Sequence, residues 1–300
     1  MRHLRQAIIV VFVSCFMLAT GTTRAVAAER GALFKLSAGG HTMLLFGTMH
    51  VGMPEYYPLE PRIRAAVEQA SALVMEVDPL VDPGRMAQAI RTYGAHAPGD
   101  HGHHPPPALK ARLDKALRTY RIEPGAVAHL KPWLVATALT LGEFSAQGTQ
   151  AELSVDAHLA QLARARKVPV VELESLDAQM RLFNRLSQQD QWQMLADTVD
   201  SIESGRQQVD VRAIIAAWGG ADRAALESIA RQVESDDTTA GRFMQKVLLE
   251  ERNGPMADKL AAMLKQQDNV VAAIGVLHLV GSASVPAKLR ARGITVERIY

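Results

Sequence analysis

The feature that most constrains the fold is a set of short runs that are apolar at nearly every position rather than at alternate positions. A strand that is apolar on both faces has to be covered on both faces, which is typical of a largely parallel sheet packed between helices. Between these runs, the apolar residues recur at helical spacing. The sequence therefore predicts an α/β fold with a largely parallel or mixed central sheet flanked by helices. The runs are LLFG (44–47), ALVMEVD (72–78), VPVVELE (168–174) and NVVAAIG (269–275).

The segments outside these runs complete the predicted organisation. Two strand-like segments flank Ala38-Gly39-Gly40, which is typical of a hairpin. A short helix at 285–291 precedes a last strand at 295–300. Residues from about 86 to 150 are mostly helical and predict an insertion or cap, and the helical stretch 178–264 is expected to pack beside it. We interpret residues 28–300 as a single domain.

The N-terminus has the pattern of a secretory signal peptide. Arg2 and Arg5 precede an almost wholly apolar run at 7–19, which is too short to span a membrane comfortably. Ala25 and Ala27 then occupy the small-x-small positions of a cleavage site. Residues 1–27 are thus predicted to be a signal peptide, and the mature protein to be periplasmic or secreted, without membrane association after cleavage. An uncleaved anchor is the alternative.

We expect N-terminal sequencing of the exported protein to begin at Ala28, because cleavage after Ala27 fits the small-residue pattern. Recovery of a chain that still carries Met1, in the membrane fraction, would contradict this prediction.

Removal of the leader changes the charge and cysteine content. The chain has a formal net charge of +2, and residues 1–27 carry three arginines and no acidic residue, so the mature charge is −1. This balance gives no indication of nucleic-acid binding. Cys15 is the only cysteine and lies in the leader, so a metal site in the mature chain would use His, Asp and Glu.

Two apolar runs end in the same way. Gly47 is followed three residues later by His50, and Gly275 by His278. With 21 glycines and 10 histidines, chance produces roughly 0.7 such spacings in the chain, so one match alone is weak. A glycine at a strand end permits a sharp turn or a close approach of another backbone. Two histidines buried for structural reasons are the alternative to a shared site.

Carboxylates follow the other two apolar runs. Glu76 and Asp78 end the second, and Glu172 and Glu174 end the third. In parallel α/β sheets, ligands bind at the carboxyl ends of the strands, so two imidazoles and several carboxylates are predicted to converge on one rim. We expect rim residues to support little of the core. Glutamates that merely cap helices are the alternative.

A rival cluster of metal-binding side chains lies in a Pro/Gly-rich loop. It comprises Asp100, His101, His103 and His104, and tracts of this kind do bind metal. Prolines 105–107 are expected to keep the loop at the surface, with no apolar wall around it. We therefore interpret it as a solvated loop.

Several separated blocks together resemble the TraB/PrgY/GumN family, which includes the TIKI proteases. The resemblance covers nearly the whole mature chain and implies a fold akin to the erythromycin-esterase and ChaN-like group. The similar blocks are LLFGTMHVG, LVMEVD, LKPWLVATAL, LSVDAHLAQLARARKVPVVELESLDAQ, EERNGPMADKL, AAIGVLHLVG and LRARGITVERI.

The resemblance also implies a reaction. TIKI members act as metal-dependent proteases through the paired Gly-x-x-His motifs and a glutamate, whereas erythromycin-esterase relatives use a histidine and a glutamate without needing a metal. Carried over, the catalytic set is His50, Glu76, His278 and Arg252, and the first three are the expected ligands of a divalent ion (Mn, Co or Zn). The supporting residues are Gly47, Asp78, Glu174, Asn253 and Gly275.

Two classes of function follow. The first is an exported metal-dependent hydrolase, a peptidase above all, acting on a peptide or small molecule. Glu76 then serves as ligand or general base, and Arg252 either stabilises an oxyanion or pairs with a carboxylate. Without metal, one histidine is the base and Glu76 orients it. The second is a non-enzymatic binder of a peptide or haem-like ligand, or an accessory protein in polysaccharide or pheromone handling.

Overall fold

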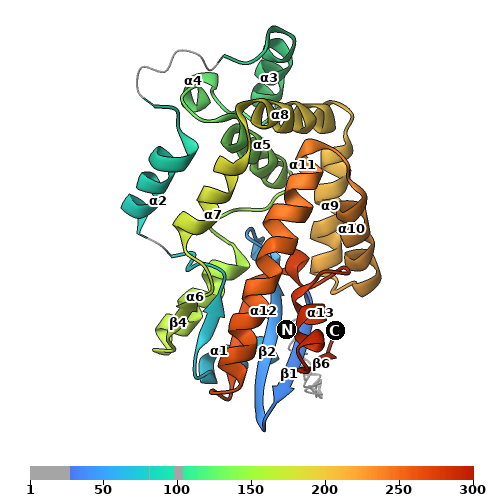
Figure 1. Ribbon diagram of the computed structural model, residues 1–300. Helices are drawn as coiled ribbons and strands as arrows, with labels where there is room; N and C mark the ends of the chain where they lie inside the picture. Colours follow the sequence, from blue (N-terminus) through green and yellow to red (C-terminus); the bar gives the residue numbers. More distant parts are fainter. Residues whose placement is uncertain (1–27, 81, 98–103) are drawn as a thin grey trace, which may run out of the picture.

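A six-stranded mixed sheet forms the lower part of the molecule (Figure 1). The computed structural model describes residues 28–80, 82–97 and 104–300, so the predicted signal peptide and two of the loop histidines, His101 and His103, lie outside the described residues. The strand order is β4-β3-β5-β2-β1-β6. The strands are β1 (Leu33–Ala38), β2 (His41–Thr48), β3 (Leu73–Met75), β4 (Val170–Glu172), β5 (Val270–Gly275) and β6 (Thr295–Arg298).

The four apolar runs form the parallel part of this sheet. β5 pairs in parallel with β2 on one side and with β3 on the other, and β3 pairs in parallel with β4. Every residue of β5 is buried, as expected for a central strand covered on both faces. β1 is antiparallel to both β2 and β6, so the sheet is mixed. The predicted α/β fold class is confirmed.

The glycines predicted to form the first hairpin have the backbone that such a turn requires. Gly39 and Gly40 have φ angles of 58° and 86°, in the left-handed region where a side chain is unfavourable. Two left-handed residues match the twist of the flanking strands in a two-residue hairpin. β1 and β2 pair in register through Ala38 and His41, which confirms the hairpin.

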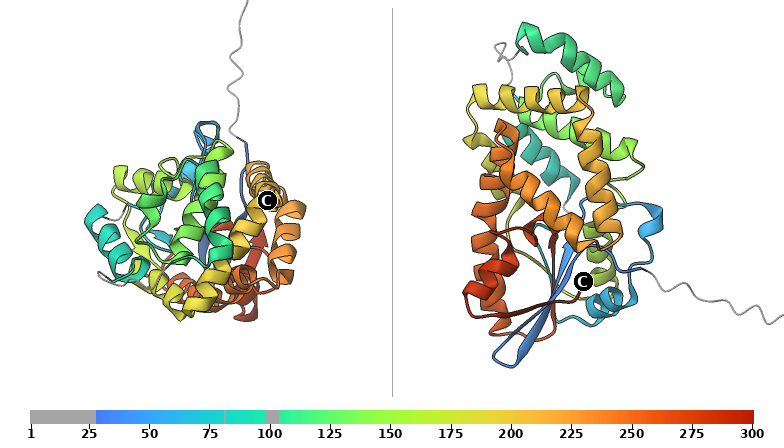
Figure 2. Two further views of the ribbon diagram at one scale, coloured as in Figure 1. Left: turned by 90° about the horizontal axis from the view of Figure 1, so that it is seen from above. Right: turned by 90° about the vertical axis from the view of Figure 1, so that its right-hand side faces the viewer.

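Helices cover both faces of the sheet. Figure 2 shows α12 (Glu251–Leu264) and α13 (Val285–Ala291) on one face, and α1 (Pro61–Gln69) and α6 (Val155–Ala165) on the other. Ser154 caps α6 as predicted, since its hydroxyl accepts a hydrogen bond from the backbone N–H of Ala157. The predicted helix at 285–291 is confirmed as α13.

Most of the remaining helices form a layer above the carboxyl edge of the parallel strands (Figures 1 and 2). The elements from 83 to 146 are α2 (Pro83–Ala89), the π-helix η2 (Ile90–Gly94), α3 (Pro107–Thr119), α4 (Pro124–Val127) and α5 (Pro132–Ala146). Those from 176 to 250 are α7 (Leu176–Leu182), η3 (Phe183–Arg185), α8 (Gln188–Glu203), α9 (Arg206–Gly219), α10 (Arg223–Ser235), α11 (Thr239–Arg242) and the π-helix η4 (Phe243–Glu250). The end of α9 and α10 also pack into the cluster around the sheet, through Trp218 and Leu226. Two 3-10 turns, η1 (Pro54–Tyr56) and η5 (Val276–His278), follow β2 and β5.

The helical layer has a hydrophobic core of its own. Trp133, Leu139 and Leu195 are buried in a cluster separate from the one that surrounds the sheet. The cap thus consists of two chain segments rather than the 86–150 stretch alone. A single domain over 28–300 stays a prediction. Among the described residues, no helix has both the length and the apolar character needed to cross a membrane.

Candidate active site at the carboxyl edge of the sheet

The parallel strands bring the predicted side chains to one edge. Thr48 at the end of β2 lies opposite Gly275 at the end of β5, so His50 and His278 follow neighbouring strands. Glu76 comes directly after β3, and its carbonyl accepts a hydrogen bond from the N–H of Glu174, beyond β4. Side chains that are separated by up to 228 positions therefore meet because their strands are parallel neighbours.

His50 belongs to a histidine–carboxylate pair. Its Nδ1 lies 3.0 Å from Oδ2 of Asp156, in the first turn of α6, and the Thr48 hydroxyl donates to the other carboxylate oxygen at 2.6 Å. Asp156 is only 8% exposed, whereas the His50 side chain is 69% exposed. With Nδ1 held by the carboxylate, Nε2 of His50 is left for a ligand.

Gly47 and Gly275 are needed for space rather than for an unusual backbone conformation. Neither has a left-handed backbone, and the missing side chain lets neighbouring groups approach closely. A Cβ atom on Gly275 would lie 3.1 Å from Glu76 Oε1 and 3.4 Å from His50 Nε2. A Cβ atom on Gly47 would lie 2.9 Å from the Val276 side chain. The Gly-x-x-His spacing thus lets a carboxylate and an imidazole pack against the backbone at the end of β5, and lets the turn after β5 pack against β2.

Arg252 on α12 joins the two glutamates. Its Nη2 donates to Glu76 and, at 2.7 Å, to Glu174, and its Nε donates to Glu174 at 2.9 Å. Its Nη1 donates to the Leu248 carbonyl at 2.9 Å and lies 3.2 Å from His278 Nε2. A guanidinium has five N–H groups, and all five are engaged. In this arrangement Arg252 pairs with carboxylates, and it has no N–H left to donate to an oxyanion.

The hydrogen bonds of His278 define its tautomer. Asn253 donates its amide N–H to the Ala283 carbonyl at 2.9 Å, so its amide oxygen faces His278 Nδ1 at 2.5 Å. Nδ1 must then carry the proton, and Nε2 must accept from Arg252. His278 is 4% exposed, and this neutral imidazole is the form that burial favours.

The environments of the two imidazoles shift their pKa values in opposite directions. The Asp156 carboxylate raises the pKa of His50 to about 9; Glu76 adds to this rise, whereas partial desolvation of the ring and the charge of Arg252 oppose it. Burial lowers the pKa of His278 to about 4, with Glu76 opposing and Arg252 assisting. At neutral pH, the exposed ring is the charged one.

Glu76 is buried and ionised. Burial alone favours its neutral form, but the neighbouring imidazoles, the Arg252 guanidinium and the Gly275 N–H outweigh this and lower its pKa to about 2. The Gly275 N–H donates to Oε1 of Glu76 at 2.7 Å, and Gln179 lies 3.4 Å from Oε2. Glu76 is 7% exposed, so it lies beneath the rim rather than on it.

The expected metal ligands do not fit an ion in this arrangement. Oε1 of Glu76 accepts from Gly275, Oε2 accepts from Arg252, and Nε2 of His278 accepts from Arg252. An ion bound by these atoms would have to displace the guanidinium, which already supplies the compensating positive charge. In the described part of the chain, no group of three or more His, Cys, Asp or Glu side chains is arranged to hold an ion.

A cavity of about 320 Å³ opens beside these groups. Thr48, His50, Arg252, Gly275 and His278 line its polar end. The rest of its wall is apolar and comes from the segment after β2, from the helical layer and from the turn after β5: Met49, Val51, Leu141, Phe144, Ile214, Met244, Leu248, Leu249, Val276 and Leu277. The cap thus forms most of the apolar wall of the cavity, while the sheet edge supplies its polar groups.

Two of the expected supporting residues lie outside this cluster. The Asp78 carboxylate pairs with Arg164 and accepts from the N–H of Leu80. Gly47 is a packing position whose carbonyl accepts from the buried Trp218 indole at 2.8 Å. The other three, Glu174, Asn253 and Gly275, contact Arg252, His278 and Glu76 directly.

Sequence reasoning missed Asp156, although a signal was present. Asp156, Leu159, Ala160 and Ala163 fall at i, i+3, i+4 and i+7, and all four are buried on one side of α6. A carboxylate within an apolar helical stripe needs a partner, because an unpaired buried charge is costly. That pattern marks Asp156 as a residue with a buried polar contact, which is His50.

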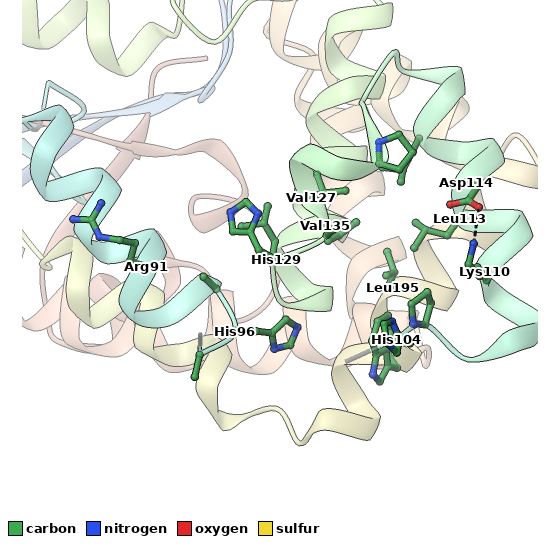
Figure 3. Close-up of a pocket in the computed structure, with 18 residues that line it drawn as sticks. Arg91, His96, His104, Lys110, Leu113, Asp114, Val127, His129, Val135 and Leu195 are labelled. Carbon is green, nitrogen blue, oxygen red and sulfur yellow. Dashed lines mark hydrogen bonds and ion pairs between the residues drawn. The ribbon is translucent and has the colours of Figure 1, made fainter. Parts of the chain in front are cut away.

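A larger cavity, of about 710 Å³, lies in the helical layer, away from the strand ends. Figure 3 shows the imidazoles of His96, His104 and His129 on its walls, from three segments of the chain. The expectation that no apolar wall lies near the histidine-rich loop is wrong for His104, since Leu113, Val135 and Leu195 line the same cavity. His101 and His103 lie outside the described residues.

Comparison with known proteins places the chain in a family. Residues 32–298 match the model of the TraB/PrgY/gumN family. The chain is 26% identical over 263 residues to "Uncharacterized protein YbaP" of Escherichia coli strain K12, covering 84% of this chain and 89% of that protein. It is also 26% identical over 257 residues to YbaP of Shigella flexneri, covering 82% and 87%. No solved structure matches the chain. Because the family model spans almost all of the described chain, the protein belongs to the TraB/PrgY/gumN family.

Proposed function

We propose that this chain is an exported hydrolase of peptide bonds, in which His50 is the proton-transferring residue and Asp156 orients it. The observation that carries the proposal is the pairing of buried Asp156 with exposed His50, which lies at the polar end of a largely apolar cavity. A buried carboxylate that fixes the tautomer of an accessible histidine is the arrangement that general acid–base catalysis requires. Export is inferred from the leader alone.

The reaction follows from the position of Nε2. Neutral His50 takes a proton from a water molecule in the cavity, and the resulting hydroxide adds to the carbonyl carbon of the substrate. Asp156 stabilises the imidazolium that forms. His50 then returns the proton to the departing amine, and the C–N bond breaks. Two products form, a carboxylic acid and an amine, and His50 returns to its starting state.

The buried groups have a supporting role in this proposal. Glu76, Glu174 and Arg252 tie the ends of β3 and β4 to α12, and Asn253 fixes His278 against the same guanidinium. Glu76 makes no hydrogen bond to either imidazole: its nearest approach is 3.7 Å, to Nε2 of His278. These contacts support a positioning role rather than that of a metal ligand or a general base.

A non-enzymatic peptide binder is the second candidate. It is favoured by the fully engaged Arg252, which offers no donor to a developing oxyanion, together with the apolar cavity wall.

Digestion of a peptide library by the mature protein distinguishes the two candidates. An enzyme generates new N-termini well beyond one equivalent of protein, whereas a binder protects a peptide stoichiometrically. We expect turnover that persists after dialysis against a chelator, because the guanidinium occupies the position an ion would need. Turnover that is lost on chelation and restored by Mn, Co or Zn would contradict the metal-independent mechanism, and the absence of turnover would favour the binder.

The pH dependence of kcat/KM reports on the same histidine. If neutral His50 is the base, kcat/KM rises about tenfold per pH unit and levels off near pH 9, the pKa to which Asp156 raises it. In Asp156→Asn, the negative charge beside His50 is gone, so the rise of kcat/KM with pH should move to lower pH, towards the ordinary histidine pKa of 6.5. The maximum value of kcat/KM should also fall. Glu76 and Arg252 also face His50 and are unchanged in this variant. A rise that stays at the same pH would show that His50 is not the titrating group.

The stability of the folded state depends on pH through the same histidine. The folded pKa of His50 lies above the unfolded value of 6.5, so its protonation stabilises the folded state fully below about 6.5. That contribution is lost as the pH rises through about 9.

A further inference from the structure

The cavity beside His50 adjoins a second one. A neighbouring cavity of about 340 Å³ shares four side chains with it: Phe144, Ile214, Met244 and Leu277. These residues come from α5, α9, η4 and η5, so the cap and the turn after β5 form the boundary between the two cavities. We call the two adjacent cavities together the groove, which extends from the candidate active site into the helical layer.

The near end of the groove exposes apolar side chains. Leu141 is 44% exposed and Met244 38%, which makes them two of the six most exposed large hydrophobic residues in the described chain. Met244 belongs to the π-helix η4. The preceding residue, Phe243, is buried against Phe183, and Met244 lines the groove. π-helical segments frequently occur at functional sites. Exposed apolar surface inside a concave site favours an apolar ligand group.

The far end of the groove is polar and acidic. Asp197, Asp210 and Asp236 line it, and none of them forms an ion pair with a described residue. Asp197 accepts from the Ala240 N–H and the Gln193 amide, and Asp236 accepts from the Thr238 N–H, so these two carboxylates also cap local backbone. The one cation on its wall, Arg206, donates instead to the Ser201 hydroxyl at 3.3 Å. Burial raises the pKa of Asp210, with the charge of Arg206 opposing this rise and that of Asp236 adding to it.

Thr140, Thr198, Ser201, Gln207 and Thr238 line the same wall. Thr140, Thr198 and Gln207 donate to the Ala136, Met194 and Leu139 carbonyls, which leaves their oxygens as acceptors.

We infer that the groove binds an extended peptide with a large apolar side chain beside the scissile bond and a basic group further along. The apolar side chain fits the wall formed by Leu141, Phe144, Met244, Leu248 and Leu249, and the basic group is complementary to the three aspartates. The hydroxyl and amide side chains on the same wall as the aspartates suit a peptide backbone better than a hydrocarbon chain. This inference rests on the proposed function and specifies its substrate class.

Peptides of matched sequence test the apolar position. The set carries Phe, Leu or Ala at the position next to the bond cleaved, each with a distal Lys or a distal Gln. We expect kcat/KM to be at least tenfold higher for Phe or Leu than for Ala, and Met244→Glu to remove most of this difference. Val209→Glu is the matched control: Val209 lies on α9, is 65% exposed and lines neither cavity, so this variant should behave as wild type.

The basic position is tested by Asp210→Asn. This variant should lower kcat/KM several-fold for the peptides with Lys and leave those with Gln unchanged. Equal effects on both sets, or equal behaviour of Met244→Glu and Val209→Glu, would overturn the inference while leaving hydrolysis established.

A binding measurement separates this inference from the proposed function. Fluorescence anisotropy of a labelled Phe/Lys peptide with the His50→Ala variant measures occupancy of the groove without turnover. Binding that is weakened by Met244→Glu and by Asp210→Asn supports the inference even if the wild type cleaves no peptide. Competition by dodecanoate for the labelled peptide, equally strong with or without Asp210→Asn, would overturn the inference in favour of a lipid-like occupant. Failure of the peptide to bind would also overturn the inference.

Discussion

His50→Ala is expected to lower kcat/KM by about 10³-fold or more while leaving the fold intact. The variant loses the group that both removes the proton from water and returns it to the leaving amine, and such proton transfers typically contribute 10²–10⁴-fold. The side chain is 69% exposed, so its removal takes away little packing, and Thr48 still donates to Asp156. Loss of the positive charge beside Asp156 should lower the melting temperature without unfolding the chain. Steady-state kinetics on the best library peptide, together with circular dichroism and a melting curve, measure both effects.

His41→Ala is the control for this variant. His41 lies at the start of the same strand, β2, and its ring contacts the Leu264 carbonyl at the opposite end of the sheet from the site. Its replacement should leave kcat/KM within about twofold of wild type. Retained activity in His50→Ala would remove the histidine–carboxylate pair from the mechanism, and an equal loss in both variants would indicate a general effect on folding.

Arg252→Ala is expected to cause the largest loss of stability. It leaves Glu76 and Glu174, whose side chains are 9% and 17% exposed, without their shared cation. Breaking a buried ion pair from one side typically costs 3–5 kcal/mol. At roughly 2–4 °C per kcal/mol for a chain of this size, the melting temperature should fall by about 10 °C. Arg252→Lys should lie between Ala and wild type, since it keeps the charge and loses the fork of donors.

Arg112→Ala is the matched control for this prediction. Arg112 also bridges two carboxylates, Asp200 and Glu203, but all three side chains are at least one-third exposed. Exposed ion pairs contribute little to stability, so its melting temperature should stay near that of wild type. If the two variants melt alike, the buried cluster does not stabilise the strand ends.

The sequence predicted where the site residues meet, because the order of apolar runs determines which strand ends share an edge. It did not predict how deeply they are buried. Glu76 and His278 were expected on a rim that supports little of the core, but they are buried beneath Arg252. Arg252 lies on α12, which follows the long helical segment in the sequence. Only His50 is exposed as expected.

The pattern of strand ends could not predict the partner of His50. Asp156 is 106 residues away and belongs to a helix rather than to a strand end. The docking of that helix is visible only in three dimensions: the Val155 N–H donates to the Met49 carbonyl at 3.0 Å, which places the first turn of α6 against the residues that follow β2. Asn253, by contrast, was identified through the family resemblance, and it contacts His278 in the structure.

The most direct test of a single site containing both histidines is the non-additivity of their replacement. kcat/KM is measured on one peptide for His50→Ala, His278→Ala and the double variant, with melting curves to confirm that each chain is folded. When groups act as a unit, removing one of them also removes the contribution of the others to kcat/KM. If His50 and His278 belong to one site, the double variant should be little worse than the more damaged single variant. Losses that multiply, or full activity in folded His278→Ala, would contradict a shared site.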